Sequence, residues 1–197
     1  MEMENVRELV NANFASMKSV LEEFSIEDNL AKIAAAGNLM SEALSDGGKI
    51  VSCGNGGSLC DATHFAEELT ARFRKNRKAL TAVAINDPAF ITCVANDFGY
   101  DYTVSRFVEA FGKPGDVLLA ISTSGNSKNI VVGAKAAYER GMKVVSLTGK
   151  DGGELAALSD IEIRAPFTEY SDRAQEIHIK VIHTLVQIIE NELGLDK

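Results

Sequence analysis

The chain has 197 residues, of which 46% are hydrophobic and 24% charged, and its formal net charge is −8. This composition is typical of a folded globular domain and excludes disordered, collagen-like and coiled-coil chains. The acidic balance argues against a nucleic-acid partner, because binding a phosphate backbone needs a basic face. An acidic protein can still hold a small phosphate through backbone amides and hydroxyls.

The cysteines and the first residues indicate where the protein works. Cys53, Cys60 and Cys93 form no Cys-x-x-Cys pair, which excludes a disulfide framework and a thiolate zinc site. The chain starts Met-Glu-Met-Glu-Asn, without the basic start and apolar run of a signal peptide. No segment reaches the roughly 18 consecutive apolar residues of a membrane span. We therefore expect a cytoplasmic protein with no membrane partner.

Apolar periodicity predicts helices and strands in a regular order. Residues 5–46 have the spacing of two helices, and short, almost continuously apolar runs follow them. Such runs are typical of buried parallel strands. They lie at 49–53, 80–85, 117–122 and 143–147, with a weaker one at 160–164. The predicted helices between and after them lie at 58–73, 88–111, 127–140 and 170–192.

Strands that alternate with helices predict an α/β fold with a doubly wound, mainly five-stranded parallel sheet flanked by helices. We see no linker, repeat or low-complexity stretch, so we expect a single domain over 1–197. Its N-terminal helical pair would occupy 1–46, and the sheet with its flanking helices 47–197. Ligands of such sheets bind beyond the carboxyl ends of the strands.

The third strand runs into a loop rich in hydroxyl groups. Residues 122–127 read Ser-Thr-Ser-Gly-Asn-Ser, with four hydroxyls and a glycine at the start of a predicted helix. A helix N-terminus stabilises anions through its free amides and its partial positive charge. One hydroxyl would be enough for an ordinary helix cap, so four in six residues predict a phosphate site.

The first strand runs into a glycine-rich turn, Gly-Asn-Gly-Gly-Ser at 54–58. It is not a nucleotide P-loop, because no Gly-Lys-Ser/Thr follows it. It is not a dinucleotide fingerprint either, because Leu59 stands where that motif needs glycine. Two such turns at strand ends of one sheet indicate a single cleft.

Two helices carry groups suited to proton transfer or metal binding. His64 shares a helix face with Glu68 at i+4, and Glu67 at i+3 is close to that face. The spacing does not choose between the two carboxylates, and an exposed pair without function is the alternative. On the last helix, Gln175 and His183 are eight residues apart, about 12 Å along the axis and about 80° around it. They could meet at one point only if both side chains lean inward, or if they come from different subunits.

Two further features have ordinary explanations. His178 is expected to be a helix-surface or interface histidine, because metal spacing does not require it. Residues 96–100, Asn-Asp-Phe-Gly-Tyr, are either a polar turn or a contact to substrate hydroxyls.

The chain resembles the phosphoheptose isomerases, which are sugar-isomerase (SIS) domain proteins. The resemblance covers nearly the whole chain and rests on long motifs in the same order. They are C-G-N-G-G-S (53–58), D-A-T-H-F-A-E-E-L (61–69), A-N-D-F-G-Y (95–100), D-V-L-L-A-I-S-T-S-G-N-S (116–127), L-T-G-K-D-G-G (147–153) and D-R-A-Q-E-I-H-I-K-V-I-H (172–183).

The resemblance implies conversion of sedoheptulose 7-phosphate to D-glycero-D-manno-heptose 7-phosphate. That reaction is the first step of nucleotide-activated heptose synthesis for lipopolysaccharide core or surface glycans. The resemblance also implies a homotetramer with active sites at subunit interfaces.

The family's functional residues carry over by position. Glu68, rather than Glu67, matches the family, and Glu68 and His183 match its catalytic acid/base pair. The implied ligands of one zinc ion are His64, Glu68, Gln175 and His183. The implied substrate contacts are Asn55, Gly56, Gly57, Ser58, Asp61, Asn96, Asp97, Ser122, Thr123, Ser124, Ser127, Asp172 and Gln175.

Two departures and two alternatives remain. Leu59 stands where relatives often carry histidine, and Ala174 where a bulkier apolar residue is expected. One alternative is a non-catalytic SIS protein that binds a replication initiator. It is disfavoured because His64, Glu68 and His183 are all present. The other is an isomerase of a different phosphosugar, because a fold alone never fixes the substrate.

Overall fold

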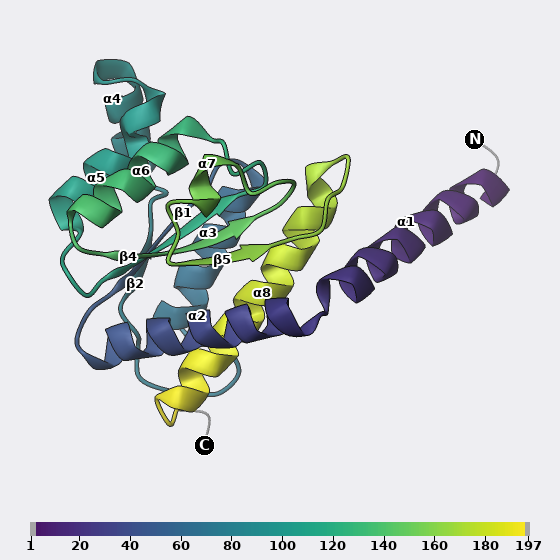
Figure 1. The fold of residues 1–197 in the computed structure, drawn as a ribbon, viewed down its shortest axis with the longest axis horizontal. Coiled ribbons are helices and arrows are strands. Elements are labelled where there is room, and N and C mark those ends of the chain that lie inside the picture. Colours follow the sequence, from purple (N-terminus) through teal and green to yellow (C-terminus); the bar gives the residue numbers. More distant parts are fainter. Residues whose placement is uncertain (1–2, 196–197) are drawn as a thin grey trace.

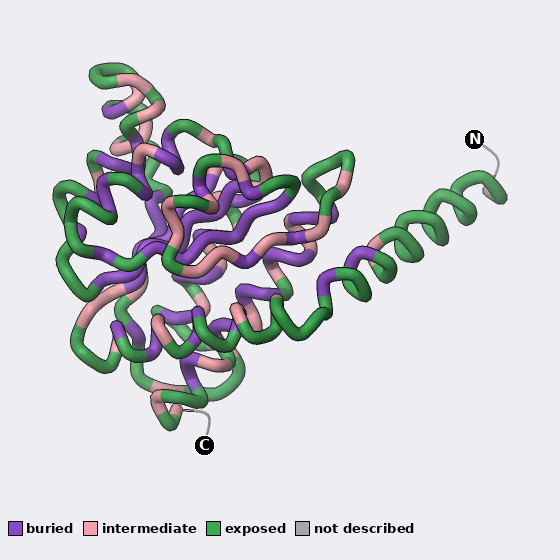
Figure 2. The backbone as a smooth tube through the Cα atoms, viewed as in Figure 1, coloured by how far each residue is buried: buried purple, intermediate pink, exposed green. Residues whose placement is uncertain are grey.

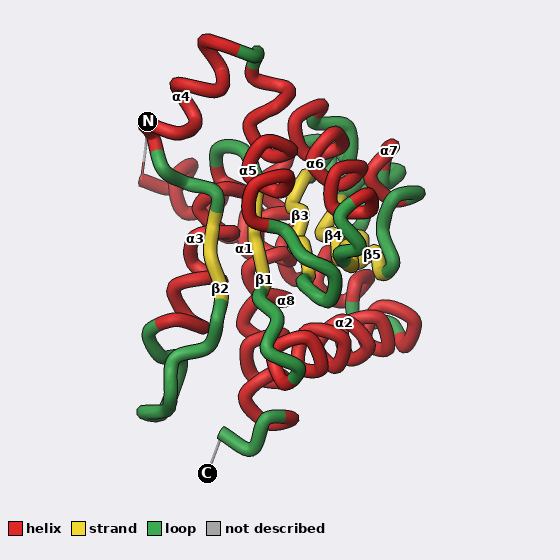
Figure 3. The backbone as a smooth tube through the Cα atoms, turned by 90° about the vertical axis from the view of Figure 1, so that its left-hand side faces the viewer, coloured by secondary structure: helices red, strands yellow, loops and turns green. Residues whose placement is uncertain are grey.

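The computed structural model describes residues 3–195, which form one five-stranded parallel sheet with helices on both faces (Figures 1 and 3). The sheet order is β2-β1-β3-β4-β5. The strands are β1 (Ile50–Cys53), β2 (Ala82–Ala84), β3 (Val117–Ser122), β4 (Lys143–Thr148) and β5 (Ile161–Arg164). Each neighbouring pair is parallel. The predicted doubly wound α/β sheet is confirmed.

The described residues form eight α-helices and one short 3-10 helix, and six of the α-helices form two layers against the sheet. The helices are α1 (Met3–Phe24), α2 (Glu27–Ser45), α3 (Gly57–Thr70), α4 (Pro88–Asp97), the 3-10 helix η1 (Tyr100–Tyr102), α5 (Thr103–Phe111), α6 (Lys128–Glu139), α7 (Gly153–Ala156) and α8 (Ser171–Glu192). Residues of α2, α3 and α8 share a core cluster with one face of the sheet, and residues of α5, α6 and α7 share one with the other. Figure 3 shows the sheet edge-on between these layers.

The alternation of side chains along each strand supplies both cores. Ile50 and Leu119 pack toward α2, α3 and α8, while their neighbours Val51 and Leu118 pack toward α5 and α6. Because both faces of the sheet are covered, β1 and β3 are buried along their whole length. This is why their sequences are continuously apolar.

Two elements differ from the predicted pattern. The helix expected over 88–111 is three elements, α4, η1 and α5. The break comes at Gly99, whose φ of +99° is incompatible with a continuing right-handed helix. The four-residue α7 was not predicted, because a single turn is too short to show an apolar period.

Helix α1 extends away from the rest of the chain (Figure 1). Most of its residues are exposed (Figure 2), and Phe14 keeps 74% of its surface accessible. Its apolar residues Val6, Leu9 and Val10, which predicted a helix by their spacing, are exposed as well. Within residues 3–195, no helix is both long and apolar enough to cross a bilayer.

The strand order determines where a ligand can sit. From β1 the chain moves outward to the edge strand β2, and then crosses to β3 on the other side of β1. The loops that leave the carboxyl ends of β1 and β3 therefore diverge to opposite sides of the sheet. Such a switch point is the usual place of a ligand crevice in open α/β sheets.

Candidate functional site

At this switch point the glycine-rich turn contacts the first turn of α6, which follows the hydroxyl-rich loop. Asn55 of the turn and Asn129 in the first turn of α6 exchange two side-chain amide hydrogen bonds, each 2.9 Å long. The Tyr100 hydroxyl donates a third bond to Asn55 Oδ1, at 2.8 Å. The glycine-rich turn is thus joined to the start of α6, the helix that follows the hydroxyl-rich loop.

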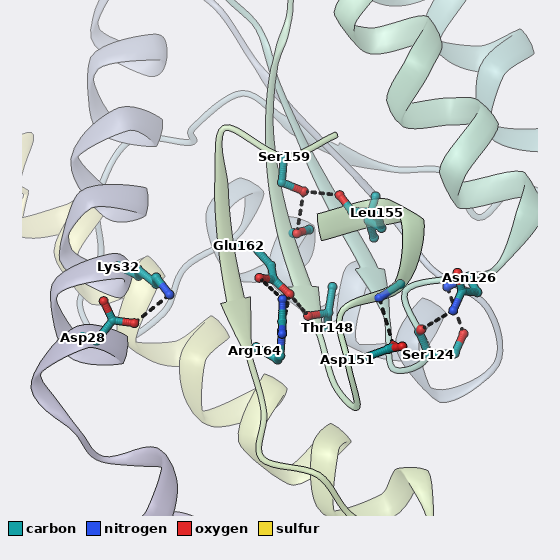
Figure 4. A network of polar contacts seen from close by, with 12 residues as sticks. Asp28, Lys32, Ser124, Asn126, Thr148, Asp151, Leu155, Ser159, Glu162 and Arg164 are labelled. Atoms are coloured by element: carbon teal, nitrogen blue, oxygen red, sulfur yellow. Dashed lines mark hydrogen bonds and ion pairs between the residues drawn. The ribbon is translucent and has the colours of Figure 1, made fainter. Parts of the chain in front are cut away.

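The hydroxyl-rich loop is fixed by close contact with the 149–153 turn. Gly125 has a φ of +65°, and a Cβ there would lie 1.9 Å from the carbonyl oxygen of Gly152. Only glycine fits this position, because the loop is packed against the 149–153 turn. The Asn126 Oδ1 accepts the Glu154 amide at 3.0 Å, and Ser124 Oγ accepts the Asn126 amide at 3.1 Å (Figure 4 shows Ser124 and Asn126).

The hydroxyls of this loop do not serve as an ordinary helix cap. Ser127 is the N-cap residue of α6, yet its side chain makes no capping hydrogen bond to the helix. Its hydroxyl instead accepts a 3.2 Å bond from the Ser122 hydroxyl. The cap alternative is therefore not supported, and the arrangement suits an anion at the helix N-terminus.

The glycine-rich turn receives Gln175 from α8. A Cβ at Gly57 would lie 2.3 Å from Gln175 Nε2, so this amide occupies the space that a side chain would fill. Gly56, with a φ of +54°, gives the turn its left-handed step. Gln175 therefore lies at the start of α3, next to the glycine backbone.

Asp61, one turn into α3, is a half-buried acid with an unused oxygen. Its Oδ2 is buried and has no hydrogen-bond partner among the described residues. Burial raises the pKa of Asp61 to about 6, while the charge of His64 acts in the opposite direction. A buried polar atom without a partner costs free energy, so Asp61 is suited to accept a bond from a ligand hydroxyl.

Three of the predicted metal ligands converge. His64 Nε2 lies 3.0 Å from His183 Nε2 and 3.4 Å from Glu68 Oε1. One ligand atom from each of the three residues lies within 4.8 Å of the other two. The structure thus brings together two residues of α3 and one of α8 at a single point.

The structure also shows which of the two neighbouring carboxylates, Glu67 or Glu68, lies with His183. The sequence spacing could not decide this. Glu67 Oε2 lies 3.5 Å from the other ring nitrogen of His64, Nδ1, and its side chain is 56% exposed. The Glu68 side chain is 13% exposed and belongs to the group with His183. Glu68 is therefore the carboxylate at the convergent point.

Gln175, the fourth predicted ligand, lies elsewhere in the same chain. It contacts Gly57 at the start of α3, while His183, about 12 Å further along α8, contacts His64. The two helices thus run side by side in the same direction, and Gln175 and His183 touch α3 about two turns apart. Within a single copy of the chain, Gln175 and His183 are therefore as far apart as their spacing in the sequence predicts.

The convergent group suits a small metal ion. Two ligand atoms 2.0–2.1 Å from a tetrahedral zinc ion are about 3.3 Å apart. The separations of 3.0 and 3.4 Å among these donors are close to that value. Two imidazoles and a carboxylate are also ligands that zinc prefers. His64, Glu68 and His183 therefore fit a zinc ion, and a fourth position stays open for another ligand.

The surroundings of His183 favour its uncharged form. Burial, and then the charge of His64, lower the pKa of His183, while Glu68 opposes this shift. The Phe73 ring stacks on His183, with ring centroids 5.7 Å apart and an angle of 27° between the rings. A neutral imidazole can accept a proton or bind a metal.

The predicted site residues Asn96, Asp97 and Asp172 belong neither to the contacts around Asn55 nor to the His64–Glu68–His183 group. Asn96 donates a 2.7 Å bond to Asp97 at the exposed end of α4, and Asp172 is exposed beside Arg173.

The expectation that His178 is a helix-surface or interface histidine was wrong. It is fully buried, and its Nε2 lies 2.8 Å from the carbonyl oxygen of Thr148 at the end of β4. Burial lowers the pKa of His178 to about 4.

Three residues that shape the site were not among the predicted site residues. Asn129 and Tyr100 hold Asn55, and Phe73 covers His183. Asn129 follows the hydroxyl-rich loop directly, and Tyr100 ends the Asn-Asp-Phe-Gly-Tyr motif, so both had a signal nearby. Phe73 had none, because only the packing of its loop onto α8 brings it to His183.

Among the cysteines, Cys93 contacts a candidate residue, because its thiol donates to Asp97 Oδ2 at 3.6 Å. All three are free, with Cys53 buried and Cys60 and Cys93 exposed. Burial raises the pKa of Cys53 to about 12, so its thiol is unreactive at neutral pH. Free thiols agree with the expected absence of a disulfide framework.

Comparison with known proteins gives one consistent result. The SIS domain family matches residues 13–149. The chain is 55% identical over 189 residues to the phosphoheptose isomerase of Aeromonas hydrophila, covering 95% of this chain and 98% of that one. It is 60% identical over 167 residues to the phosphoheptose isomerase of Yersinia enterocolitica, covering 85% and 86% of the two chains.

Solved structures agree. The phosphoheptose isomerase GmhA from Neisseria gonorrhoeae superimposes with a TM-score of 0.86 at 41% identity, covering 94% of this chain and 99% of that one. A phosphoheptose isomerase from Francisella tularensis gives a TM-score of 0.87 at 35% identity, with 94% and 98% covered.

Proposed function

The chain belongs to the phosphoheptose isomerases of the SIS domain family, and from this we propose that it converts sedoheptulose 7-phosphate to D-glycero-D-manno-heptose 7-phosphate. The observation that carries the proposal within the chain is the convergence of His64 and Glu68 with His183. A ketose–aldose isomerase needs groups that take up and return protons, and these three are the titratable groups gathered there.

The reaction moves one proton from C1 to C2 and another between the two oxygens, through a cis-enediol. Glu68 and His183 are the acid/base pair, one acting on the carbon-bound proton and the other on the oxygens. A neutral imidazole can accept a proton, and the surroundings of His183 favour that neutral form. Their separations from His64, 3.4 Å for Glu68 and 3.0 Å for His183, support the action of both groups on one small substrate fragment.

We propose that His64, Glu68, Gln175 and His183 hold a zinc ion. When bound there, zinc would supply Lewis-acid stabilisation of negative charge that develops on oxygen. A residue bound firmly to an ion is a poor base, so either the ion is loosely held or it mainly organises the site. Removal of the metal distinguishes these two arrangements.

The two loops bind the rest of the substrate in this proposal. Ser122, Thr123, Ser124 and Ser127 take the 7-phosphate at the start of α6, where the helix N-terminus favours an anion. The glycine-rich turn, with Asn55, Gly56, Gly57 and Ser58, borders the sugar chain. Asp61, Asn96, Asp97, Asp172 and Gln175 are proposed to take hydroxyl groups. The remote phosphate orients the sugar by binding energy away from the reacting carbons.

We propose that the whole chain acts as one domain and assembles as a cytoplasmic homotetramer with active sites between subunits. Two observations support the assembly. Val6, Leu9, Val10 and Phe14 of α1 are exposed in one copy, and Gln175 lies two turns of α3 away from the other metal ligands. Contact between copies would let Gln175 of one approach the His64–Glu68–His183 group of another. The product would enter the synthesis of nucleotide-activated heptose for lipopolysaccharide or surface glycans.

The test is a comparison of substrates. The purified protein is incubated separately with sedoheptulose 7-phosphate, a ketopentose phosphate and a ketohexose phosphate, and the aldose phosphate formed is measured. The proposal expects kcat/KM to be highest for the heptose by at least about tenfold, which corresponds to 1.4 kcal/mol of transition-state binding. A higher value for a pentose or hexose phosphate would assign the enzyme to that sugar instead.

A further inference from the structure

We propose that Arg77 is a positioning residue of the isomerase site, because its buried guanidinium ties the end of α3 that carries Glu68 to the helix that carries His183. This inference rests on the proposed function of Glu68 and His183. Arg77 itself lies in the loop between α3 and β2, outside the predicted site, and its side chain is directed toward the protein interior.

The guanidinium of Arg77 has partners on both helices. Its Nη2 donates to the backbone carbonyl of Glu68 at 2.6 Å, and its Nη1 donates to the carbonyl of Leu69 at 2.7 Å. Its Nε donates to Glu190 Oε1 of α8 at 2.7 Å. A planar guanidinium with several donors can make such a set of bonds at fixed angles, which a lysine ammonium cannot reproduce.

The burial of this ion pair shows that the contact is built into the fold. The Arg77 side chain is 2% exposed and the Glu190 side chain 6%, although Lys78, next to Arg77, is exposed. Charged side chains are almost never fully buried unless they are paired. Arg77 also supplies hydrogen-bond donors to carbonyl groups at the C-terminal end of α3. No glycine provides the usual C-terminal cap of this helix, and its last carbonyls need donors.

Arg77 couples the position of Glu68 on α3 to the position of His183 on α8. Glu190 follows His183 by seven residues, so both side chains lie on nearly the same face of α8, two turns apart. Arg77 therefore holds that face of α8 against the backbone of Glu68 itself. Phe73, four residues before Arg77, stacks on the His183 ring and gives the same loop a second contact with the site.

The separation of Glu68 and His183 is the quantity that this contact controls. A displacement of about 1 Å in a catalytic constellation can cost roughly 100-fold in rate. The hydroxyl-rich loop lies between other elements, β3 and α6, whereas Arg77 bonds to Glu68, Leu69, Lys78 and Glu190. Loss of Arg77 should therefore lower kcat while KM for the phosphosugar changes little.

The test separates positioning from stability with a single and a double variant. Arg77→Met leaves Glu190 buried without its partner, which is strongly destabilising, whereas Arg77→Met combined with Glu190→Leu leaves no unpaired charge. We expect the double variant to recover most of the thermal stability that the single variant loses. Its kcat should stay about 10- to 100-fold below that of the unmodified enzyme, with KM within about threefold. Lys78→Met, which removes the neighbouring exposed cation, should leave both constants unchanged.

Recovery of kcat together with stability in the double variant would overturn the proposal, because Arg77 would then only stabilise the fold. Arg77→Lys is the second variant: it keeps the charge and the pairing with Glu190, so it should fold and still lose kcat. A normal kcat in that variant also contradicts positioning.

A readout without turnover keeps this test separate from the proposed function. The chain has three histidines, so the imidazole nitrogen resonances of His64 and His183 can be followed by NMR. We expect both to shift in Arg77→Lys and to stay in place in Lys78→Met. Unshifted resonances in Arg77→Lys would reject positioning. An unmodified protein inactive on every phosphosugar would reject the proposed function, while the shifts would still decide the role of Arg77.

Discussion

The Nε2 atoms of His64 and His183 lie 3.0 Å apart, although 119 residues separate them in the chain. The contact exists because α3 and α8 pack side by side on one face of the sheet and run in the same direction. Glu68, one turn after His64, joins the pair from the same face of α3. The chemistry of the site therefore depends on the packing of these two helices.

The acid/base assignment predicts that Glu68→Gln and His183→Ala each abolish turnover while the fold survives. Loss of a positioned acid or base costs about 100- to 10,000-fold in rate. The measurement is kcat for sedoheptulose 7-phosphate, with circular dichroism to show that the helices are retained. Glu67→Gln is the matched control, because this exposed neighbour also faces His64 and should leave turnover near normal.

Near-normal turnover in either of the first two variants would remove that residue from the chemistry. Loss of turnover in Glu67→Gln, with Glu68→Gln active, would transfer the role to the other carboxylate.

The proposed metal ligands predict a stoichiometric zinc site. Metal analysis after dialysis against micromolar zinc should find one ion per subunit, and His64→Ala should lose most of it, because two donors remain in the convergent group. His178→Gln is the control, since His178 is buried away from this group against Thr148. Equal zinc content in His64→Ala and the unmodified protein would reject the assignment.

The phosphate assignment predicts that Ser124→Ala raises KM strongly, by roughly tenfold for one lost hydrogen bond to an anion, with a smaller change in kcat. The reason is that the phosphate is bound equally in the ground state and the transition state. Ser45→Ala, at the exposed end of α2, should leave both constants unchanged. A KM unaffected by Ser124→Ala would count against phosphate binding by this loop.

The burial of His178 predicts a loss of stability in mild acid. Its pKa is 6.5 in the unfolded chain and about 4 in the folded one, so between these values the unfolded chain binds more protons. Stability is therefore fully present above pH 6.5 and falls as the pH drops toward 4, by on the order of 3 kcal/mol. Asp61 acts in the opposite direction, because its pKa is raised by folding to about 6.

His178→Gln isolates the histidine contribution, because its amide can still donate to the Thr148 carbonyl but does not titrate. Thermal unfolding of both proteins at pH 7 and pH 5 is compared. The decrease in Tm from pH 7 to pH 5 should be smaller in the variant. An equal decrease would mean that His178 does not carry the acid sensitivity.

Local patterns were sufficient to predict the sheet and the position of the two loops. The five strands lie where continuous apolar runs were found, and both loops follow strands at the switch point. Patterns could not predict the contacts between distant elements. Asn55 bonds to Asn129, and Phe73 covers His183, only because the folded sheet and helices bring them together.

His178 shows the same limit for burial. In the sequence it is one polar residue on a helix that also carries Gln175 and His183. Only the packing of α8 against the end of β4 provides the carbonyl of Thr148 that satisfies its ring nitrogen. A histidine without that acceptor would be expected at the surface.

The most direct test of the account is proton NMR of the purified protein with sedoheptulose 7-phosphate, recorded as isolated, after a chelator, and after zinc is added back. If the chain is a zinc-dependent heptose phosphate isomerase, signals of an aldoheptose 7-phosphate should disappear with chelation and return with zinc. Product that persists under chelation would support the isomerase activity but show that zinc is not essential for it. No product from folded, zinc-loaded protein would contradict the central claim that this chain isomerises a heptose phosphate.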